Sequence, residues 1–348
     1  MINSDYITLS PETQKGLIEA AALQMKVDPT VVEKDLWVVL VLQILFHRIH
    51  EYNSYNALTF KGGTSLSKAY QIIERFSEDI DITIDRKFLG LQASDEELKN
   101  LTRNQRDKSL EELNKRGHKF IETGILPYLK AKLSSLVPKE QIEVQFNIDD
   151  SLSLEIYYPS RLESPYSSYI KPRIYVEFGV RGDPYPTESK YVRPYLHEKI
   201  TQLNDLCVPV NVLLPVRTFL EKVTLLHAEA HRHADKNTPK RLSRHYYDLY
   251  QLVEKGYFDE AKKQPDLLKS VIANKSLFFA SKEASYETIF TNGLKLLPSE
   301  DRIKEIAADY KEMSIMIFGE MPRFEEILSS IGKIEEILNE VIENTSSD

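Results

Sequence analysis

The pattern of hydrophobic and polar residues predicts two helices at the start of the chain. Ser10-Pro11 and Asp28-Pro29 each combine a helix-capping residue with a proline that fits the first helical turn. The first pair predicts a helix over residues 11–25. The second predicts a mostly buried helix over residues 30–50, whose apolar run is interrupted by the charged triplet Glu33-Lys34-Asp35.

A strand, a glycine turn, a helix and a second strand are predicted next. The apolar run over residues 57–60 favours a short buried strand, and the spacing of apolar residues over 66–75 is compatible with a helix. Over residues 79–85, isoleucines at 80, 82 and 84 alternate with polar residues, which is typical of a half-buried strand. This alternation places Asp79 and Asp81 on the same face.

The rest of the chain contains further strand candidates and then mainly helices. Strands are predicted over 142–148, 152–158 and 173–180, after charged or amphipathic helices over 94–116 and 120–136. The stretch 206–214 is apolar, and Pro209 and Pro215 bound a segment that is interpreted as a crossing between domains. Helices are predicted from Pro215 onward. We therefore expect two domains, residues 1–205 and 206–348.

The glycine turn between the first strand and the helix has features of a phosphate-binding site. Gly62 and Gly63 have no Cβ, so their backbone N–H groups are accessible to a phosphate. Thr64 and Ser65 add hydroxyl donors, and a helix N-terminus favours an anion. A Gly-Gly pair alone is usually a simple turn, so a phosphate site is indicated only if catalytic groups lie nearby.

Asp79 and Asp81 are candidate metal ligands, the catalytic groups that would accompany a phosphate site. Two neighbouring carboxylates repel each other unless a cation lies between them, and oxygen ligands suit Mg²⁺, or Mn²⁺ in its place. Glu177, on the polar face of the strand over 173–180, is the candidate for a third metal carboxylate, with Glu143 and Glu155 as weaker candidates. The alternative for each acid is a solvated strand position.

Four separated motifs resemble the nucleotidyltransferase toxins of the AbiEii/AbiGii type, a family that includes the MenT toxins. They are Gly62-Gly63-Thr64-x-Leu66 with Ser77-Glu78-Asp79-Ile80-Asp81, Val32-Glu33-Lys34-Asp35-x-Trp37, Glu221-Lys222-x-x-x-Leu226, and Arg244-His245-Tyr246-Tyr247-Asp248-Leu249. Their order and spacing match the family up to about residue 255. The chain departs from many nucleotidyltransferases because Gly63 replaces a serine and the spacer to the acids is longer.

The resemblance implies an α+β fold, with a polymerase-β-like mixed sheet flanked by helices and a helical C-terminal lobe that contributes Lys222 and Asp248. It implies a metal-dependent enzyme that transfers an NMP from an NTP to RNA, in several members to the 3′ acceptor end of tRNA. The implied partner is a winged-helix antitoxin. The implied catalytic residues are Asp79, Asp81, Lys222 and Asp248, and the metal ligands are Asp79, Asp81 and Glu177. The expected nucleotide-binding residues are Lys61, Gly62, Gly63, Thr64, Ser65, Lys68, Arg244 and His245.

Composition and charge fit a cytoplasmic location. The single cysteine excludes an intrachain disulfide, and no segment is typical of a signal peptide or a membrane span, so we expect no membrane partner. The net charge of −8 argues against nucleic-acid binding. Residues 217–245, however, carry seven Lys/Arg against three acids, so a locally basic face remains compatible with RNA.

Several motifs also have simpler interpretations. The triplet Glu33-Lys34-Asp35 can be an intrahelical charge cluster, which we favour slightly, or a support for the sheet, as the resemblance implies. Lys222 can extend its ammonium to solvent from an apolar face, and Arg244 can pair with Asp248 at i,i+4. The spacing His227-x-x-x-His231-x-His233 fits zinc only weakly, because no cysteine or zinc-type glutamate accompanies it.

Tyrosines alternate with basic residues over 159–194, which favours either stacking of unpaired RNA bases or a proline-bounded loop region. Two functions from different classes therefore remain open. The first is the nucleotidyltransferase. The second is a nucleotide-binding regulatory module that senses GTP or another nucleotide without transferring it.

Overall fold

A computed structural model describes residues 5–51, 57–162, 171–200, 203, 206–281 and 283–346. The chain forms two compact units. Unit 1 contains residues 1–69, 76–92 and 103–212, and unit 2 contains residues 70–75, 93–102 and 213–348. The expected division at 205/206 stays a prediction, and two short segments of the N-terminal half belong to unit 2.

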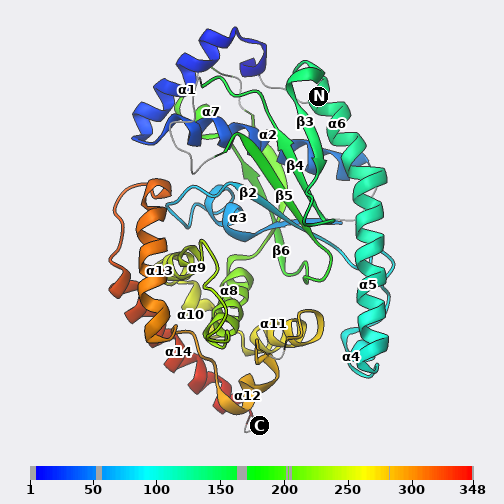
Figure 1. Ribbon diagram of the computed structural model, residues 1–348, viewed down its shortest axis with the longest axis vertical. Coiled ribbons are helices and arrows are strands. Elements are labelled where there is room, and N and C mark those ends of the chain that lie inside the picture. The colour runs from blue at the N-terminus through cyan, green and yellow to red at the C-terminus, as the bar shows by residue number, and fades with distance from the viewer. Residues whose placement is uncertain are drawn as a thin grey trace. The chain divides into compact units, whose positions relative to one another are not determined.

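Unit 1 is built around a mixed seven-stranded sheet in the order β3-β4-β5-β2-β1-β7-β6 (Figure 1). Strand β2 pairs antiparallel with β1 and parallel with β5, and β1 pairs parallel with β7. The strands are β1 (Leu58–Lys61), β2 (Asp79–Ile84), β3 (Glu143–Phe146), β4 (Ser153–Tyr157), β5 (Arg173–Gly179), β6 (Thr187–Val192) and β7 (Val208–Leu213). The predicted α+β class with a mixed sheet flanked by helices is confirmed.

Helices cover this sheet. The helices of unit 1 are α1 (Pro11–Met25), α2 (Pro29–Glu51), α3 (Gly62–Lys68), α5 (Arg103–Phe120), α6 (Leu126–Ser134) and α7 (Tyr195–Lys199). As predicted, Ser10 caps α1, and its hydroxyl accepts a hydrogen bond from the Thr13 N–H at 3.3 Å. Helix α2 packs against β2 and β5, and its residues 36–42 are almost completely buried. The main core of unit 1 therefore lies between α2 and the isoleucine face of β2.

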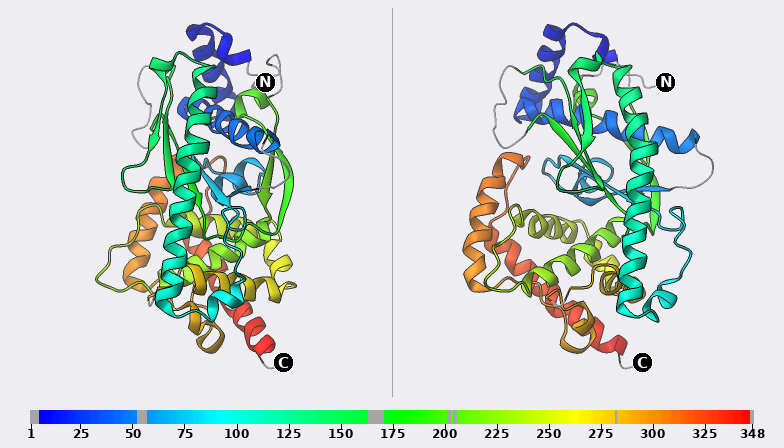
Figure 2. Two further views of the ribbon diagram at one scale, coloured as in Figure 1. Left: turned by 90° about the vertical axis from the view of Figure 1, so that its right-hand side faces the viewer. Right: turned by 45° about the vertical axis from the view of Figure 1, so that its right-hand side comes forward.

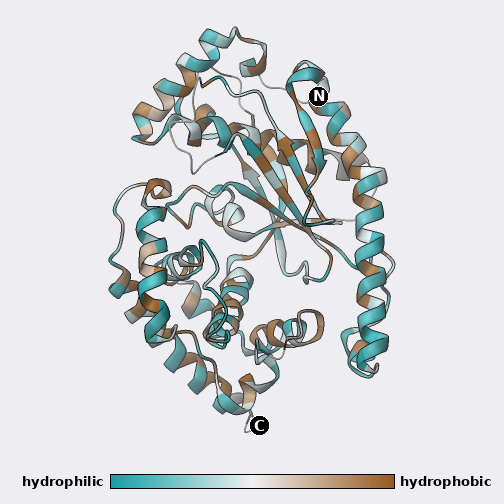
Figure 3. Ribbon diagram, viewed as in Figure 1, coloured by the Kyte–Doolittle hydropathy of each residue, from teal (hydrophilic) through white to brown (hydrophobic). Residues whose placement is uncertain are grey.

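Helix α5 continues through a π-helical turn at Ile121–Ile125 into α6, so the chain stays helical from 103 to 134 (Figure 2). The interruption expected between residues 116 and 120 does not occur, and Gly117 lies buried inside α5. Only Leu110, Leu113 and Gly117 of α5 are buried, and the helix is mainly hydrophilic in Figure 3. This helix therefore presents a charged surface to solvent, as its sequence predicts.

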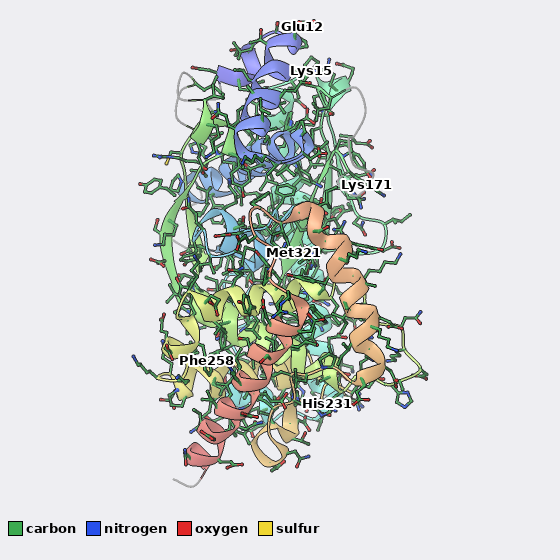
Figure 4. All side chains as sticks on the ribbon, turned by 90° about the vertical axis from the view of Figure 1, so that its left-hand side faces the viewer. Glu12, Lys15, Lys171, His231, Phe258 and Met321 are labelled. Atoms are coloured by element: carbon green, nitrogen blue, oxygen red, sulfur yellow. The ribbon has the colours of Figure 1, made fainter. Side chains whose placement is uncertain are left out.

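Unit 2 is helical, as predicted. Its helices are α4 (Asp95–Lys99), α8 (Pro215–Ala230), α9 (Ser243–Glu254), α10 (Tyr257–Ala261), α11 (Pro265–Phe278), α12 (Ile289–Asn292), α13 (Glu300–Glu312) and α14 (Phe324–Ser346). The Phe219 ring of α8 lies 6.0 Å from the Phe258 ring of α10, which is labelled in Figure 4. Within the described residues, no helix is both long and apolar enough to cross a bilayer.

Several predicted elements differ from the structure. The single helix expected over 94–116 is divided into α4 and α5, with residues 100–102 between them. The helix expected over 66–75 begins at Gly62 and ends at Lys68. The chain enters unit 2 at Tyr70, and Gln71 has a positive φ of 53°, which a helix does not accommodate. Residues 208–213, expected as a crossing, form β7 inside the sheet, with Pro209 on the exposed side. Residues 187–192, for which a proline-bounded loop was one of two alternatives, form β6 at the sheet edge, where a strand needs only one neighbour.

Candidate functional site

The glycine turn and the acidic strand of unit 1 lie against each other. Lys61, the last residue of β1, is the register partner of Asp81 on β2. Gly62 follows with φ +76°, and a Cβ added there would lie 2.0 Å from Oδ2 of Asp81. Position 62 therefore requires glycine for two reasons: its φ is left-handed, and the Asp81 carboxylate occupies the space that a side chain would need.

Three carboxylates lie on the same face of neighbouring strands. Asp79 and Asp81 alternate with buried isoleucines on β2, and Glu177 of β5 is the register partner of Asp81. A donor set of carboxylate oxygens fits a hard cation such as Mg²⁺, which usually takes one or two protein carboxylates. Among the described residues, however, no three His, Cys, Asp or Glu side chains are assembled as a metal cluster. Glu177 as a third ligand stays a prediction.

The two weaker candidates for the third acid lie farther along the sheet. Glu155 is on β4, where it forms an ion pair with Arg173 and accepts a hydrogen bond from Tyr157 at 2.8 Å. Glu143 is exposed on the edge strand β3. Of the three candidates, Glu177 alone is on a strand that pairs directly with β2.

The hydroxyl groups of Thr64 and Ser65 hold the turn in place. The Thr64 hydroxyl donates to the backbone carbonyl of Asp79 and lies 2.9 Å from the Ser77 hydroxyl. The Ser65 hydroxyl donates to the Gly62 carbonyl at 2.8 Å, and both side chains are buried. The Thr64 bonds fasten the first turn of α3 to the start of β2, and the Ser65 bond closes that turn on itself. Phosphate binding by the same hydroxyls stays a prediction.

The two lysines that flank the turn lie in different surroundings. The half-buried Lys61 places its Nζ 3.6 Å from the Cβ position of Gly182, beside Thr83. The Lys68 ammonium is buried, lies 2.9 Å from Asp35 Oδ1 and contacts the face of the Tyr195 ring. Lys68 thus joins α3 to α2, and nucleotide binding by either lysine stays a prediction.

Each member of the charged triplet of α2 binds a different segment of unit 1. Lys34 Nζ lies 2.6 Å from Glu78 Oε2, one residue before Asp79. Glu33 accepts a hydrogen bond from the Ser160 hydroxyl at 2.7 Å, and Asp35 accepts one from the Tyr195 N–H at 2.6 Å. Burial raises the pKa of both Glu33 and Asp35. The interpretation as an intrahelical charge cluster is wrong, because the three side chains bind other elements.

Unit 2 contains a second buried group of charges, centred on Asp248 of α9. Lys222 Nζ of α8 lies 2.8 Å from Asp248 Oδ2, and Arg75 Nε lies 2.7 Å from Oδ1. Asp248 is completely buried, which by itself would raise its pKa. The adjacent Arg75 and Lys222 cations outweigh burial and hold the pKa of the Asp248 carboxyl well below its usual range.

Lys222 and His245 have lowered pKa values in this group. Burial is the main cause for Lys222, and the Arg75 and Arg244 cations add to it, against the opposite effect of Asp248. His245 Nδ1 lies 3.4 Å from Lys222 Nζ. Burial and then the Lys222 charge place the pKa of His245 well below its usual value, so the imidazole is neutral at pH 7 and its Nδ1 accepts from the ammonium.

Two simpler interpretations of the C-terminal motifs were wrong, and the weakly indicated zinc site finds no support at His227. Lys222 is 7% exposed, so its ammonium does not extend to solvent. Asp248 pairs with Arg75 and Lys222 rather than with Arg244 at i,i+4. His227 accepts a hydrogen bond from the Lys295 N–H at Nδ1 (3.0 Å) and donates from Nε2 to the Ser285 carbonyl (3.4 Å), so both ring nitrogens are unavailable to zinc.

The tyrosine-rich region is described only in part. Tyr185 and Tyr191 are 51% and 67% exposed, whereas Tyr195 packs under Lys68. Tyr166 and Tyr169 lie outside the described residues. Stacking of RNA bases on these rings stays a prediction.

Arg75 and the Lys34–Glu78 pair were not identified from the sequence. Arg75 stands directly before Phe76-Ser77-Glu78-Asp79, and its position next to that motif was the available signal. Its partner Asp248 is 173 residues away, so no local periodicity links the two.

The sequence model of a protein family described as "Nucleotidyl transferase AbiEii toxin, Type IV TA system" matches residues 43–330. Among solved structures, the chain is similar to MenT4, a nucleotidyltransferase toxin from Mycobacterium tuberculosis H37Rv, with 15% identity and a TM-score of 0.49. That match covers 95% of this chain and 89% of the MenT4 chain. No curated protein matches the chain.

Proposed function

Because the chain belongs to the AbiEii family of nucleotidyltransferase toxins, we propose that it transfers an NMP from an NTP to RNA, at the 3′ acceptor end of tRNA, in the cytoplasm. The observation that carries the proposal is the contact between the Gly62 turn and Asp81. It brings a backbone turn suited to phosphate next to a carboxylate pair suited to a divalent cation.

Asp79 and Asp81 would hold Mg²⁺ or Mn²⁺, with Glu177 as a further ligand or as the base. A bound divalent cation would offset charge on the triphosphate and favour ionisation of the attacking hydroxyl. Gly62 and Gly63 contribute the backbone of the first turn of α3, whose N–H groups have no partner within the helix. Thr64 keeps this turn fixed against β2, and Ser65 bonds the Gly62 carbonyl within the turn.

Lys222 would supply positive charge to the triphosphate, and Asp248 would hold its ammonium in place. Lys61, Lys68, Arg244 and His245 are the remaining residues proposed for nucleotide binding. In the transfer, the 3′ oxygen of the RNA bonds to the α-phosphorus, the bond from that phosphorus to the bridging oxygen breaks, and pyrophosphate leaves. The proton of the hydroxyl passes to the base or to water.

The biological consequence is set by the product. A tRNA whose 3′ end carries an extra nucleotide cannot be aminoacylated, so translation and growth stop. A winged-helix antitoxin is the proposed partner that counteracts this effect. Exposed Tyr185 and Tyr191 of unit 1 support an RNA acceptor, because aromatic rings can stack on the unpaired bases of a single-stranded end.

The direct test incubates the purified protein with total tRNA, Mg²⁺ and each radiolabelled NTP in turn. We expect label from one or a few NTPs to enter RNA covalently. Asp81→Asn keeps the size of the side chain and removes its charge, so incorporation should be lost. Asp149→Asn, at an exposed position of unit 1, is the matched control and should label RNA like the original protein.

Saturable nucleotide binding without incorporation from any NTP would contradict the proposal and favour the nucleotide-sensing module. Incorporation into RNA other than tRNA would keep the enzyme and change the acceptor.

A further inference from the structure

Arg75 holds Asp248 with both prongs of its guanidinium group. Nε lies 2.7 Å from Oδ1 and Nη2 lies 2.9 Å from Oδ2, and the arginine is only 3% exposed. A two-pronged pair of this kind fixes both the distance and the plane of a carboxylate, which a single contact does not. Arg75 therefore determines the orientation of Asp248.

The backbone that presents Arg75 is also anchored in unit 2. Arg75 forms an antiparallel bridge with Ile317, and the Phe318 N–H donates to the Glu74 carbonyl at 2.7 Å. The chain passes into unit 1 immediately after Arg75, at Phe76. The guanidinium group is thus held at a defined place in unit 2 by two backbone contacts.

Asp248 Oδ2 is shared between Arg75 and Lys222, whose Nζ lies 2.8 Å from it. Rotation of the carboxylate away from Arg75 would therefore also move the position at which it meets Lys222. We infer that Arg75 is a positioning residue, which holds Asp248 in the orientation that places the Lys222 ammonium for nucleotidyl transfer. This inference rests on the function proposed above for Lys222.

The charges around Lys222 make the inference measurable. The groups that face Lys222 are Asp248, Arg244 and His245 from α9 and Arg75 from the segment 70–75. The Arg75 cation lowers the pKa of Lys222, whereas Asp248 raises it. Removal of Arg75 should therefore shift the titration of Lys222 to higher pH, and removal of the Asp248 charge should shift it to lower pH.

The test uses full-length protein labelled with ¹³Cε-lysine, with the Lys222 resonance assigned by its loss in Lys222→Met. The chemical shift is followed against pH in the original protein, Arg75→Gln and Asp248→Asn. Arg323→Gln is the control, because it removes another arginine–carboxylate pair of unit 2, in which Arg323 Nε lies 2.8 Å from Glu326. We expect shifts of opposite sign in the first two variants and none in the control. An unchanged Lys222 titration in Arg75→Gln would overturn the inference.

The same variants are then compared in RNA labelling across pH. Arg75→Gln should lower transfer about 10–100-fold, as for other residues that orient a functional side chain, and move the alkaline limb of the pH–rate profile upward. A Lys222 titration that shifts while the pH–rate profile stays unchanged would refute the role proposed for Lys222. It would leave unchanged the conclusion that Arg75 orients Asp248 toward Lys222.

Arg75→Lys tests whether the two-pronged contact with Asp248 is needed. It also replaces Arg75→Gln in the experiment if that variant does not fold. It keeps the charge but offers one ammonium in place of two prongs. We expect a Lys222 titration close to that of the original protein together with reduced transfer. Full activity in Arg75→Lys would show that the two-pronged contact is not needed, and would overturn the inference.

Discussion

The space that a side chain would occupy at Gly62 is filled by the carboxylate of Asp81. A Cβ at position 62 would lie 2.0 Å from Asp81 Oδ2 and 2.7 Å from its carboxyl carbon. The glycine of the motif is therefore needed to place an acid, in addition to its expected role of giving a phosphate access to the backbone. This relation links the two halves of the motif within unit 1.

Gly62→Ala should therefore displace Asp81 and strain the backbone at a positive φ. We expect a loss of transfer activity and a decrease of about 1–3 kcal/mol in the free energy of unfolding. Gly16→Ala is the matched control, because nothing lies within 4 Å of a Cβ added there and the residue is inside α1. It should keep activity and gain up to about 1 kcal/mol in stability. Equal activity of the two variants, measured by RNA labelling, would contradict this account of Gly62.

Lys34→Met should strongly destabilise unit 1, because it leaves the Glu78 carboxylate buried without its ammonium partner 2.6 Å away. We expect a decrease of about 3–5 kcal/mol in the free energy of unfolding measured with urea. The exposed pair of Lys115 and Glu111, with an N–O distance of 2.7 Å, provides the comparison. Lys115→Met should cost less than about 1 kcal/mol. A similar decrease in the free energy of unfolding in Lys34→Met and Lys115→Met would show that the buried pair contributes no more to stability than the exposed pair.

His227 should make stability depend on pH. Burial is the main cause that lowers the pKa of His227 to about 4. Between that value and its usual pKa the unfolded chain binds the proton and the folded chain does not, so stability falls as pH falls from about 6.5 to 4. The loss should reach about 3 kcal/mol. His227→Asn should flatten this part of the curve of unfolding free energy against pH. If the curve of His227→Asn is as steep as that of the original protein, His227 is not the group that causes the loss of stability.

The elements that the sequence predicts correctly are those set by local chemistry. The cap at Ser10 defines the start of α1, and the alternation of isoleucines with polar residues defines β2. The predicted order of strand, glycine turn, helix and strand also placed Gly62 near Asp81, as the structure does. The prediction was possible because few residues separate the two. Local periodicity was sufficient for this part of the candidate site.

Long-range contacts explain what the sequence did not predict. Arg75 was placed in a helix by the spacing of its apolar neighbours, but its pairing with Asp248 and its bridge to Ile317 hold it in an extended segment. The triplet beginning at Glu33 looked like a local charge cluster because its partners, such as Glu78, lie far along the chain. Strand β7 was missed because prolines at both ends suggested a connection rather than a sheet position.

The Mg²⁺ dependence of RNA labelling in the original protein, Asp81→Asn and Asp149→Asn shows whether Asp79 and Asp81 hold a divalent cation that nucleotidyl transfer requires. Labelling should vanish with EDTA and return with Mg²⁺ in the original protein and in Asp149→Asn, while Asp81→Asn should stay at least about 100-fold less active at every Mg²⁺ concentration. Labelling that survives EDTA, or an Asp81→Asn variant with the same Mg²⁺ response as the original protein, would show that transfer does not depend on a cation held by these two aspartates.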